Sequence, residues 1–234
     1  MITPCIIKNE THEQDAPEII CLIDSSGSPS FQKTFIPYFN AFLKTQQALP
    51  SPAKMSIAFF DNQLRFANES TPLHEIMPLS GNYFSTVGKT ALLDGIGRTI
   101  NALKATMKKK QVIMAIFTHG QESGSWEFST KRISKMLHKR LQKKHWQIFL
   151  FTANQATILN GLQLGINPRY CIYVDEGNEG LLWALTLFEY ACFVKRHYHT
   201  LFSESPLYHE ADFNTLSYSF IQQELKTLKA YNIK

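Results

Sequence analysis

The residues best suited to chemistry form the stretch Asp24-Ser25-Ser26-Gly27-Ser28, which directly follows a short apolar run. A carboxylate followed by hydroxyls two and four positions later supplies hard oxygen donors on a tight, glycine-containing turn. Such donors suit Mg²⁺, which prefers octahedral geometry and keeps several waters. Asp and Ser also cap helices, because they accept hydrogen bonds from free backbone N–H groups. The spacing alone leaves both interpretations open.

Further polar residues stand at the ends of other apolar runs. They are Asp61, Thr118-His119-Gly120, Thr152 with Asn154, and Asp175. In an open parallel sheet, ligands bind beyond the carboxyl ends of the strands, where the strand order reverses. We therefore expect these residues to gather near Asp24 at one edge of a sheet.

The order of apolar runs and helical segments predicts that sheet. Strand-like runs occupy residues 18–23, 55–61, 112–118, 146–152 and 170–175. Segments of helical period occupy residues 31–43, 90–108, 127–144, 155–164 and 180–199. The run at 63–69 follows a turn at Asp61-Asn62 so tightly that it must return antiparallel. Pro37 predicts that the first helix starts late or kinks.

This pattern predicts an α/β fold: a doubly wound, mostly parallel six-stranded sheet with one antiparallel edge strand and helices on both faces. Residues 18–200 form this domain, residues 1–17 an N-terminal extension, and residues 201–234 a helical appendage. The chain of 234 residues is globular in composition, with 44% hydrophobic and 18% charged residues. Its scattered cysteines, and the absence of a signal-like N-terminus or an apolar run of about 20 residues, predict a cytoplasmic protein.

Several blocks, taken in order, resemble the von Willebrand factor type A (vWA) family, specifically its stand-alone bacterial and phage members. They are Asp24-x-Ser26-x-Ser28, FNAFL at 39–43, FDN at 60–62, GKTALLDGIG with Thr90, IFTHG at 116–120 and WQIFLFTANQ at 146–155. The resemblance covers residues 18–200 and implies a Rossmann-like fold with a metal-ion-dependent adhesion site (MIDAS).

The resemblance also implies the chemistry of that site. Asp24, Ser26, Ser28 and Thr90 would coordinate Mg²⁺ or Mn²⁺ directly or through water. An acidic side chain of another protein would complete the metal shell. A partly coordinated dication attracts a carboxylate, so the physical chemistry agrees with this implication.

One departure concerns His119, which stands where the family usually has Asp. Losing that carboxylate lowers the affinity for a hard cation, and an imidazole ligand shifts the preference toward Zn²⁺ or a similar transition metal. The nearby carboxylates of Glu122, Asp94 and Asp61 are candidates to restore charge in a second shell.

Two neighbouring features bear on ligands. Tyr83 and Phe84 precede Thr90 in a loop and are candidate anchors for a partner protein, because interfaces favour aromatic residues. Gly88-Lys89-Thr90 imitates part of a P-loop, but Tyr83 stands where that motif requires Gly, so we expect no nucleotide site.

The leading hypothesis is therefore a non-enzymatic, protein-binding module that uses the strand edge and a divalent cation. A metal-assisted hydrolase with His119 as ligand or general base is one alternative. The other uses the basic stretch 131–144 of this +5 chain to bind nucleic acid or an anionic membrane. A solvated helix face explains that stretch more simply, because no aromatic residues are interleaved with its charges.

Overall fold

The computed structural model describes residues 16–26, 29–84, 88–108, 110–142, 145–175, 177–198, 221–223 and 225–226. Its centre is a six-stranded sheet in the order β3-β2-β1-β4-β5-β6. The strands are β1 (Glu18–Asp24), β2 (Lys54–Phe60), β3 (Leu64–Pro72), β4 (Val112–Thr118), β5 (Trp146–Thr152) and β6 (Cys171–Tyr173). Neighbouring strands are parallel except β2 and β3, which are antiparallel. The predicted sheet with one antiparallel edge strand is confirmed.

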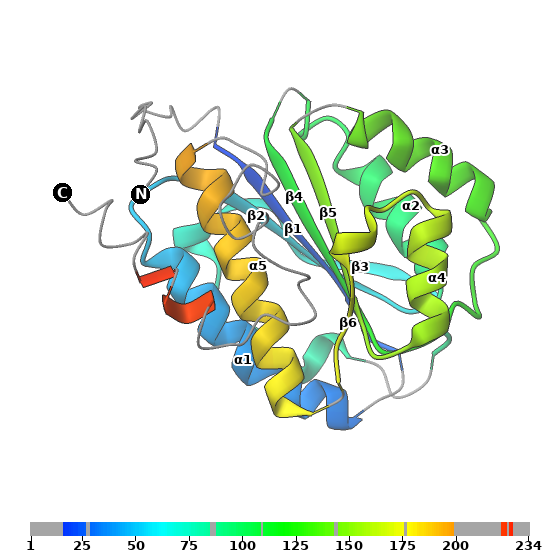
Figure 1. The fold of residues 1–234 in the computed structure, drawn as a ribbon, viewed down its shortest axis with the longest axis horizontal. Coiled ribbons are helices and arrows are strands. Elements are labelled where there is room, and N and C mark those ends of the chain that lie inside the picture. Colours follow the sequence, from blue (N-terminus) through cyan, green and yellow to red (C-terminus); the bar gives the residue numbers. More distant parts are fainter. Residues whose placement is uncertain are drawn as a thin grey trace.

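Helices cover both faces of this sheet (Figure 1). One face carries α1 (Pro29–Gln47) and α5 (Asn178–Tyr198), and the other carries α2 (Leu92–Ala102), α3 (Thr130–Leu141) and α4 (Gln155–Gln163). Single 3-10 turns lie in the connections: η2 (Leu73–Glu75), η3 (Gly81–Tyr83) and η4 (Pro168–Tyr170). Because both faces are covered, β1, β4 and β5 are buried along their whole length, and their sequences are almost continuously apolar.

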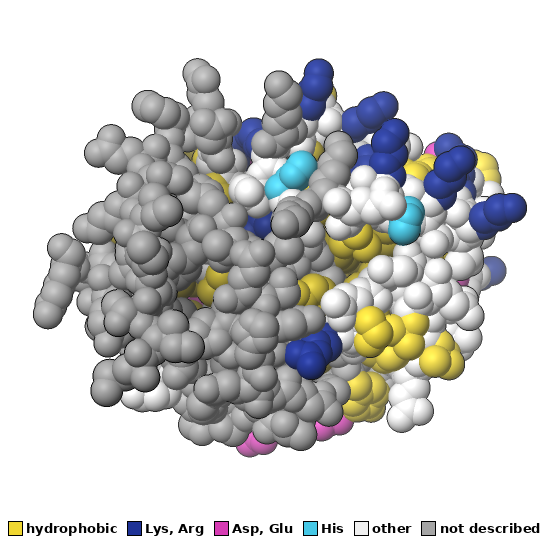
Figure 2. Space-filling model, turned by 45° about the horizontal axis from the view of Figure 1, so that its top comes forward, with side chains coloured by type: hydrophobic (Ala, Val, Ile, Leu, Met, Phe, Trp, Pro, Cys, Tyr) yellow, Lys and Arg dark blue, Asp and Glu magenta, His cyan; other side chains and the backbone are white. Residues whose placement is uncertain are grey.

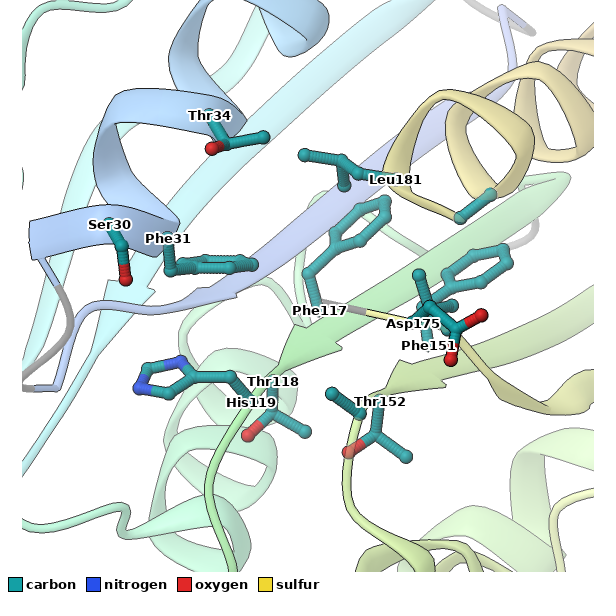
Figure 3. A pocket seen from close by; sticks show the side chains of 13 residues that line it. Ser30, Phe31, Thr34, Phe117, Thr118, His119, Phe151, Thr152, Asp175 and Leu181 are labelled. Carbon is teal, nitrogen blue, oxygen red and sulfur yellow. The ribbon is translucent and has the colours of Figure 1, made fainter. Parts of the chain in front are cut away.

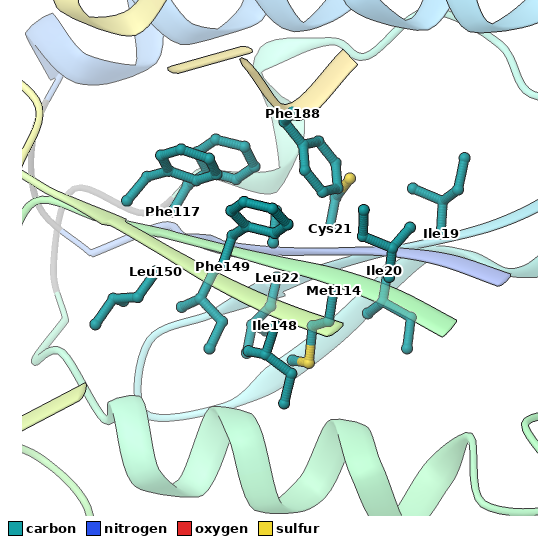
Figure 4. Packing of buried hydrophobic residues seen from close by; sticks show 14 of the residues in the cluster. Ile19, Ile20, Cys21, Leu22, Met114, Phe117, Ile148, Phe149, Leu150 and Phe188 are labelled. Carbon is teal, nitrogen blue, oxygen red and sulfur yellow. The ribbon is translucent and has the colours of Figure 1, made fainter. Parts of the chain in front are cut away.

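The core divides into two layers, because successive strand side chains point to opposite faces. Figure 4 shows Phe149 pointing toward Phe188 of α5, while Ile148 and Leu150 point to the other side. The ring centroids of Phe149 and Phe188 lie 6.0 Å apart, nearly edge to face. These two layers hold the strands in register and so fix the positions of the strand ends.

Helix boundaries differ from the prediction in three places. α1 begins at Pro29 and continues through Pro37, so of the two alternatives predicted from Pro37, a late start or a kink, the late start does not occur. Pro37 lies on the exposed side of α1, where its ring meets solvent, and buried Phe35 and Phe39 hold the helix to the sheet on either side of it. α2 and α3 are shorter than the predicted 90–108 and 127–144.

The terminal segments are described only in part. Of the predicted helix at 210–230, residues 221–223 and 225–226 are described and helical, with Ile221 and Leu225 buried. The other residues of that helix, and residues 1–15 of the N-terminal extension, lie outside the described residues. Among the helices that the structure describes, none has the length and hydropathy needed to cross a membrane.

Candidate functional site at the carboxyl ends of β1 and β4

Asp24 is the last residue of β1, which lies between β2 and β4 in the middle of the sheet. Its carboxylate is fully buried. Oδ1 accepts two hydrogen bonds from Ser26, one from the backbone N–H at 2.9 Å and one from the hydroxyl at 2.6 Å. The turn after β1 therefore closes on the carboxylate that precedes it, which fixes Ser26 beside Asp24.

Two threonines from distant segments complete the arrangement. Thr118 ends β4, and its hydroxyl donates to Oδ2 of Asp24 at 2.6 Å. Thr90 precedes α2; its hydroxyl lies 2.9 Å from that of Ser26 and 3.4 Å from Oδ2 of Asp24. Both threonines are buried. We call Asp24, Ser26, Thr90 and Thr118 the edge cluster.

The edge cluster contains three of the residues that the sequence selected as metal ligands, together with one that it expected near Asp24 without assigning it as a ligand. Asp24, Ser26 and Thr90 meet as the family resemblance implies. Thr118 was expected near Asp24 as a strand-end residue, and no role in the site was assigned to it. Its signal was its register: it ends the strand that pairs with β1, so its side chain reaches the same carboxylate. Ser28 lies outside the described residues.

His119 lies beside the edge cluster without a hydrogen bond to it. Its Nδ1 atom is 3.8 Å from Oδ2 of Asp24, too far for a hydrogen bond. Nδ1 is buried and has no hydrogen-bond partner among the described residues, although 20% of the side chain is exposed. The ring stacks on Phe31 with centroids 5.0 Å apart. The imidazole thus faces Asp24 and is held by stacking.

Gly120 leaves the room that the edge cluster needs. A Cβ atom at this position would collide with the hydroxyl of Thr90 and lie 3.5 Å from Oδ2 of Asp24. The carbonyl of Gly120 also accepts a hydrogen bond of 3.0 Å from Thr157 of α4. A glycine after His119 therefore allows the β4 end and the Thr90 segment to approach closely.

Asp94, a proposed second-shell carboxylate, serves another purpose. It is 1% exposed and accepts hydrogen bonds from the backbone N–H groups of Trp126, Glu127 and Phe128 at 2.9 to 3.3 Å. Arg98 lies 3.6 Å away. Its oxygens are thus used to hold the loop before α3 against α2.

Glu122 and Asp61 are likewise engaged by neighbouring groups. Glu122 accepts hydrogen bonds from the backbone of Leu93 at 3.0 Å and from the backbone and hydroxyl of Ser125, both at 2.8 Å. It thereby caps the first turn of α2. Asp61 forms an ion pair of 2.7 Å with Arg65 across the β2–β3 turn. Because these contacts use the carboxylate oxygens of Asp94, Glu122 and Asp61, Asp24 is the one of the four candidate carboxylates that belongs to the edge cluster.

Tyr83 and Phe84, the proposed partner anchors, pack inward. The Tyr83 ring stacks on Phe59 at 4.9 Å and 8°, and Phe84 meets Phe59 edge to face at 5.3 Å. Both side chains are partly buried against the core. This packing favours a role in positioning the loop before Thr90.

A small pocket of about 100 Å³ opens beside the edge cluster (Figure 3). It lies between the starts of α1 and α5, above the ends of β4 and β5. Its walls include the apolar Phe31, Phe117, Phe151 and Leu181 and the polar Thr118, His119, Thr152 and Asp175. A cavity that admits benzene measures about 150 Å³, so this pocket suits one small side chain.

The donor set of the edge cluster fits a hard dication in kind but carries little charge. Oxygens on adjacent vertices of a magnesium octahedron lie about 3 Å apart, because Mg–O bonds are about 2.1 Å. The hydroxyls of Ser26 and Thr90 are 2.9 Å apart. The described residues contain no group of three or more His, Cys, Asp and Glu suited to a metal. A cation here would be held by hydroxyls and a single carboxylate, which predicts weak binding.

Comparison with known proteins places the fold. No family model matches the sequence, and no curated protein matches it. Among solved structures, proximal thread matrix protein 1 from the mussel byssus is similar with a TM-score of 0.56 and 14% identity, over 76% of this chain and 46% of that one. This chain thus spans about half the length of the mussel protein. A second structure of that protein is described as having a zinc-occupied MIDAS motif, at a TM-score of 0.56 and 13% identity, over the same shares of the two chains.

A third match broadens the comparison. The manganese-loaded TRAP protein of Plasmodium vivax is similar with a TM-score of 0.50 and 16% identity, over 74% of this chain and 72% of that one. At these low identities the structural similarity shows the shared fold alone, and the expected vWA fold is confirmed. The strand order and these structural matches show that the chain has the fold of the von Willebrand factor type A domain family.

Proposed function

We propose that this chain is a non-enzymatic binding module that holds a partner protein at the edge cluster, with a divalent cation between the two. The observation that carries the proposal is the convergence of Asp24, Ser26, Thr90 and Thr118 at one strand edge. These oxygen donors come from three separate stretches of chain. Zinc and manganese in structures of the same fold are consistent with this proposal.

The residues that would hold the cation are Ser26, Thr90 and Asp24, with Nδ1 of His119 as a further donor. A bound dication supplies positive charge and an open coordination position for an oxygen anion. An acidic side chain of a partner protein has the matching chemistry. His119 contributes a nitrogen where a second carboxylate would have added negative charge, so we expect Zn²⁺ to bind more tightly than Mg²⁺ or Mn²⁺.

Binding is favoured over catalysis by what surrounds His119. Its ring stacks on Phe31, but its Nδ1 atom forms no hydrogen bond with the described residues, so none of them supplies the hydrogen bond that would fix the tautomer of a general base. The other carboxylates suggested for this site, Asp94, Glu122 and Asp61, cap backbone or pair with arginine. A hydrolase would need a second acid or a nucleophile near the reacting atoms.

Calorimetric titration with Mg²⁺, Mn²⁺ and Zn²⁺ tests the cation. We expect Asp24→Asn to abolish binding, and Asp175→Asn, which changes an exposed carboxylate on the same edge, to leave it unchanged. His119→Asp restores a second carboxylate and should tighten Mg²⁺ binding at least tenfold. Identical titrations for the native chain and Asp24→Asn would refute the cation site.

Selection from a library of displayed random peptides tests whether the partner is recognised through an acidic side chain. We expect peptides selected on the Mn²⁺-loaded chain to share an Asp or Glu, to be released by EDTA, and to lose binding to Asp24→Asn. Peptides that bind the Asp24→Asn chain equally well, or that EDTA does not release, would contradict recognition through the edge cluster.

A further inference from the structure

Charge is distributed very unevenly along this chain. Residues 128–174 contain eight of its 24 Lys and Arg and none of its 19 Asp and Glu. This segment therefore carries +8, whereas the other residues together carry −3. It forms α3, β5, α4, η4 and β6, which follow one another in the chain and lie on the side of the sheet where β5 and β6 are the last two strands. The basic character of the protein thus belongs to one part of the fold.

An apolar groove of about 650 Å³ lies within that part. It runs between the end of α3, the start of β5 and the connection from α4 to η4. Its apolar walls are Leu141, Trp146, Leu162, Ile166, Pro168 and Tyr170. Trp146 begins β5, so the groove lies at the amino ends of the strands, opposite the edge cluster. We call it the basal groove.

Apolar surface at the basal groove is open to solvent. Leu162 is 39% exposed although it lines the groove. Figure 2, in which the amino ends of the strands face the viewer, shows a hollowed hydrophobic area bordered on one side by Lys and Arg side chains. A hollow of this size is in the range of about 300–1,000 Å³ that is typical of ligand sites.

Positive charge lies at the wall of the basal groove. The guanidinium of Arg140 sits over the ring of Trp146, 5.5 Å from its centroid, and donates to the carbonyl of Met136 at 2.9 Å. Arg169 is exposed between Pro168 and Tyr170, both of which line the groove. No acidic residue is among the residues that line it. Charge and hydrophobicity here complement a ligand that is both anionic and apolar.

The aromatic residues of the groove argue against nucleic acid as that ligand. Trp146 and Tyr170 are buried, so their ring faces are not free to stack on bases. A concave apolar surface also cannot receive a flat bilayer, whereas it can receive individual Leu or Phe side chains. Acidic protein segments with large apolar side chains combine the two required features.

We propose that the basal groove binds an acidic segment of another protein, which inserts large apolar side chains between Leu162 and Trp146 while its carboxylates face the Lys and Arg residues around them. The interaction is independent of the edge cluster and of any cation.

The experiment selects random 12-residue peptides, displayed on phage, on the full chain in EDTA. Enriched peptides should contain more Asp and Glu than Lys and Arg, together with at least two large apolar residues. The best peptide is then synthesised with a fluorescent label, and its affinity is measured by anisotropy. Raising the salt concentration should weaken binding, because exposed charges are screened.

Two variants in the same helix provide the matched comparison. Leu162→Glu should weaken the peptide at least tenfold. Leu159→Glu adds the same charge one turn away, at a residue that is 60% exposed and does not line the groove, and should change affinity less than twofold. Leu162→Gln, which adds no charge, should weaken binding at least threefold. Urea unfolding of each variant verifies that it is folded.

Several results would overturn the proposal. These are enrichment of basic or uncharged peptides, no enrichment at all, and equal effects of the variants at Leu162 and Leu159. A fourth is that a 20-nucleotide DNA or phosphatidylserine vesicles bind more tightly than the peptide, and that Leu162→Glu does not change this binding. That result would assign the surface to nucleic acid or membrane. Because EDTA is present throughout, failure here leaves the cation-dependent function at Asp24 untouched.

Discussion

Replacing Asp94 by Ala should destabilise the fold strongly, although this carboxylate lies close to the edge cluster in sequence. It is 1% exposed and accepts hydrogen bonds from three backbone N–H groups, of which that of Phe128 is 2.9 Å away and buried. Removing the carboxylate leaves these three backbone donors without their acceptor, whereas Arg98 keeps its ion pair of 2.8 Å with Glu127. A buried donor left unsatisfied costs about 1–3 kcal/mol, and three donors lose their acceptor here, so we expect the free energy of unfolding to fall by about 3–5 kcal/mol.

Urea unfolding followed by circular dichroism measures the effect of Asp94→Ala. Arg98→Ala is the comparison, because its ion pair with Asp94 is long, at 3.6 Å, and its side chain is 24% exposed. Partly exposed pairs contribute about 1 kcal/mol or less. Asp94→Asn keeps one acceptor oxygen and should fall between the two. A loss below about 1 kcal/mol for Asp94→Ala, or one equal to that of Arg98→Ala, would show that Asp94 does not hold the loop before α3.

Three further outcomes are expected. Burial raises the pKa of the Glu18 carboxyl above 4.5, so the folded chain binds the carboxyl proton more tightly than the unfolded chain. The free energy of unfolding should therefore fall as the pH rises from 4.5 through the folded pKa, and urea unfolding of Glu18→Gln should lack this decline. Gly120→Ala should displace the hydroxyl of Thr90 and weaken Mn²⁺ binding, measured by calorimetry, at least tenfold. Unchanged Mn²⁺ binding would show that the site tolerates a side chain at position 120. Burial raises the pKa of the Cys171 thiol to about 12, so iodoacetamide at pH 8 should label Cys171 only after unfolding, and labelling of the native chain would contradict this burial.

Much of the fold could be predicted because strand signals are local. The runs that became β1, β4 and β5 are apolar throughout, and burial on both faces requires this pattern. The antiparallel β3 followed from the short turn after Asp61. Helix ends were less predictable, because they depend on distant partners. α2 begins where Glu122, far along the chain, accepts a hydrogen bond from the backbone of Leu93.

The candidate site was likewise predictable where the signal was local in sequence, and unpredictable where it depended on distant contacts. Asp24, Ser26 and Thr90 were selected from motif blocks, and the structure brings them together. Glu122 and Asp94 were selected for their charge and their nearness in sequence to Thr90 and His119. Sequence position could not reveal that backbone N–H groups already occupy their oxygens. A carboxylate near a site is equally suited to capping a helix, and only three-dimensional contacts decide between these roles.

The separation of the edge cluster along the chain has a consequence for biosynthesis. Ser26 meets Thr90 across 64 residues, and Asp24 meets Thr118 across 94. The first half of the protein must therefore emerge from the ribosome, and β1 must pair with β4, before the edge cluster can bind a cation or a partner. Contacts this distant in sequence also form slowly. The newly made chain thus passes through a period in which it contains the motif but cannot yet bind.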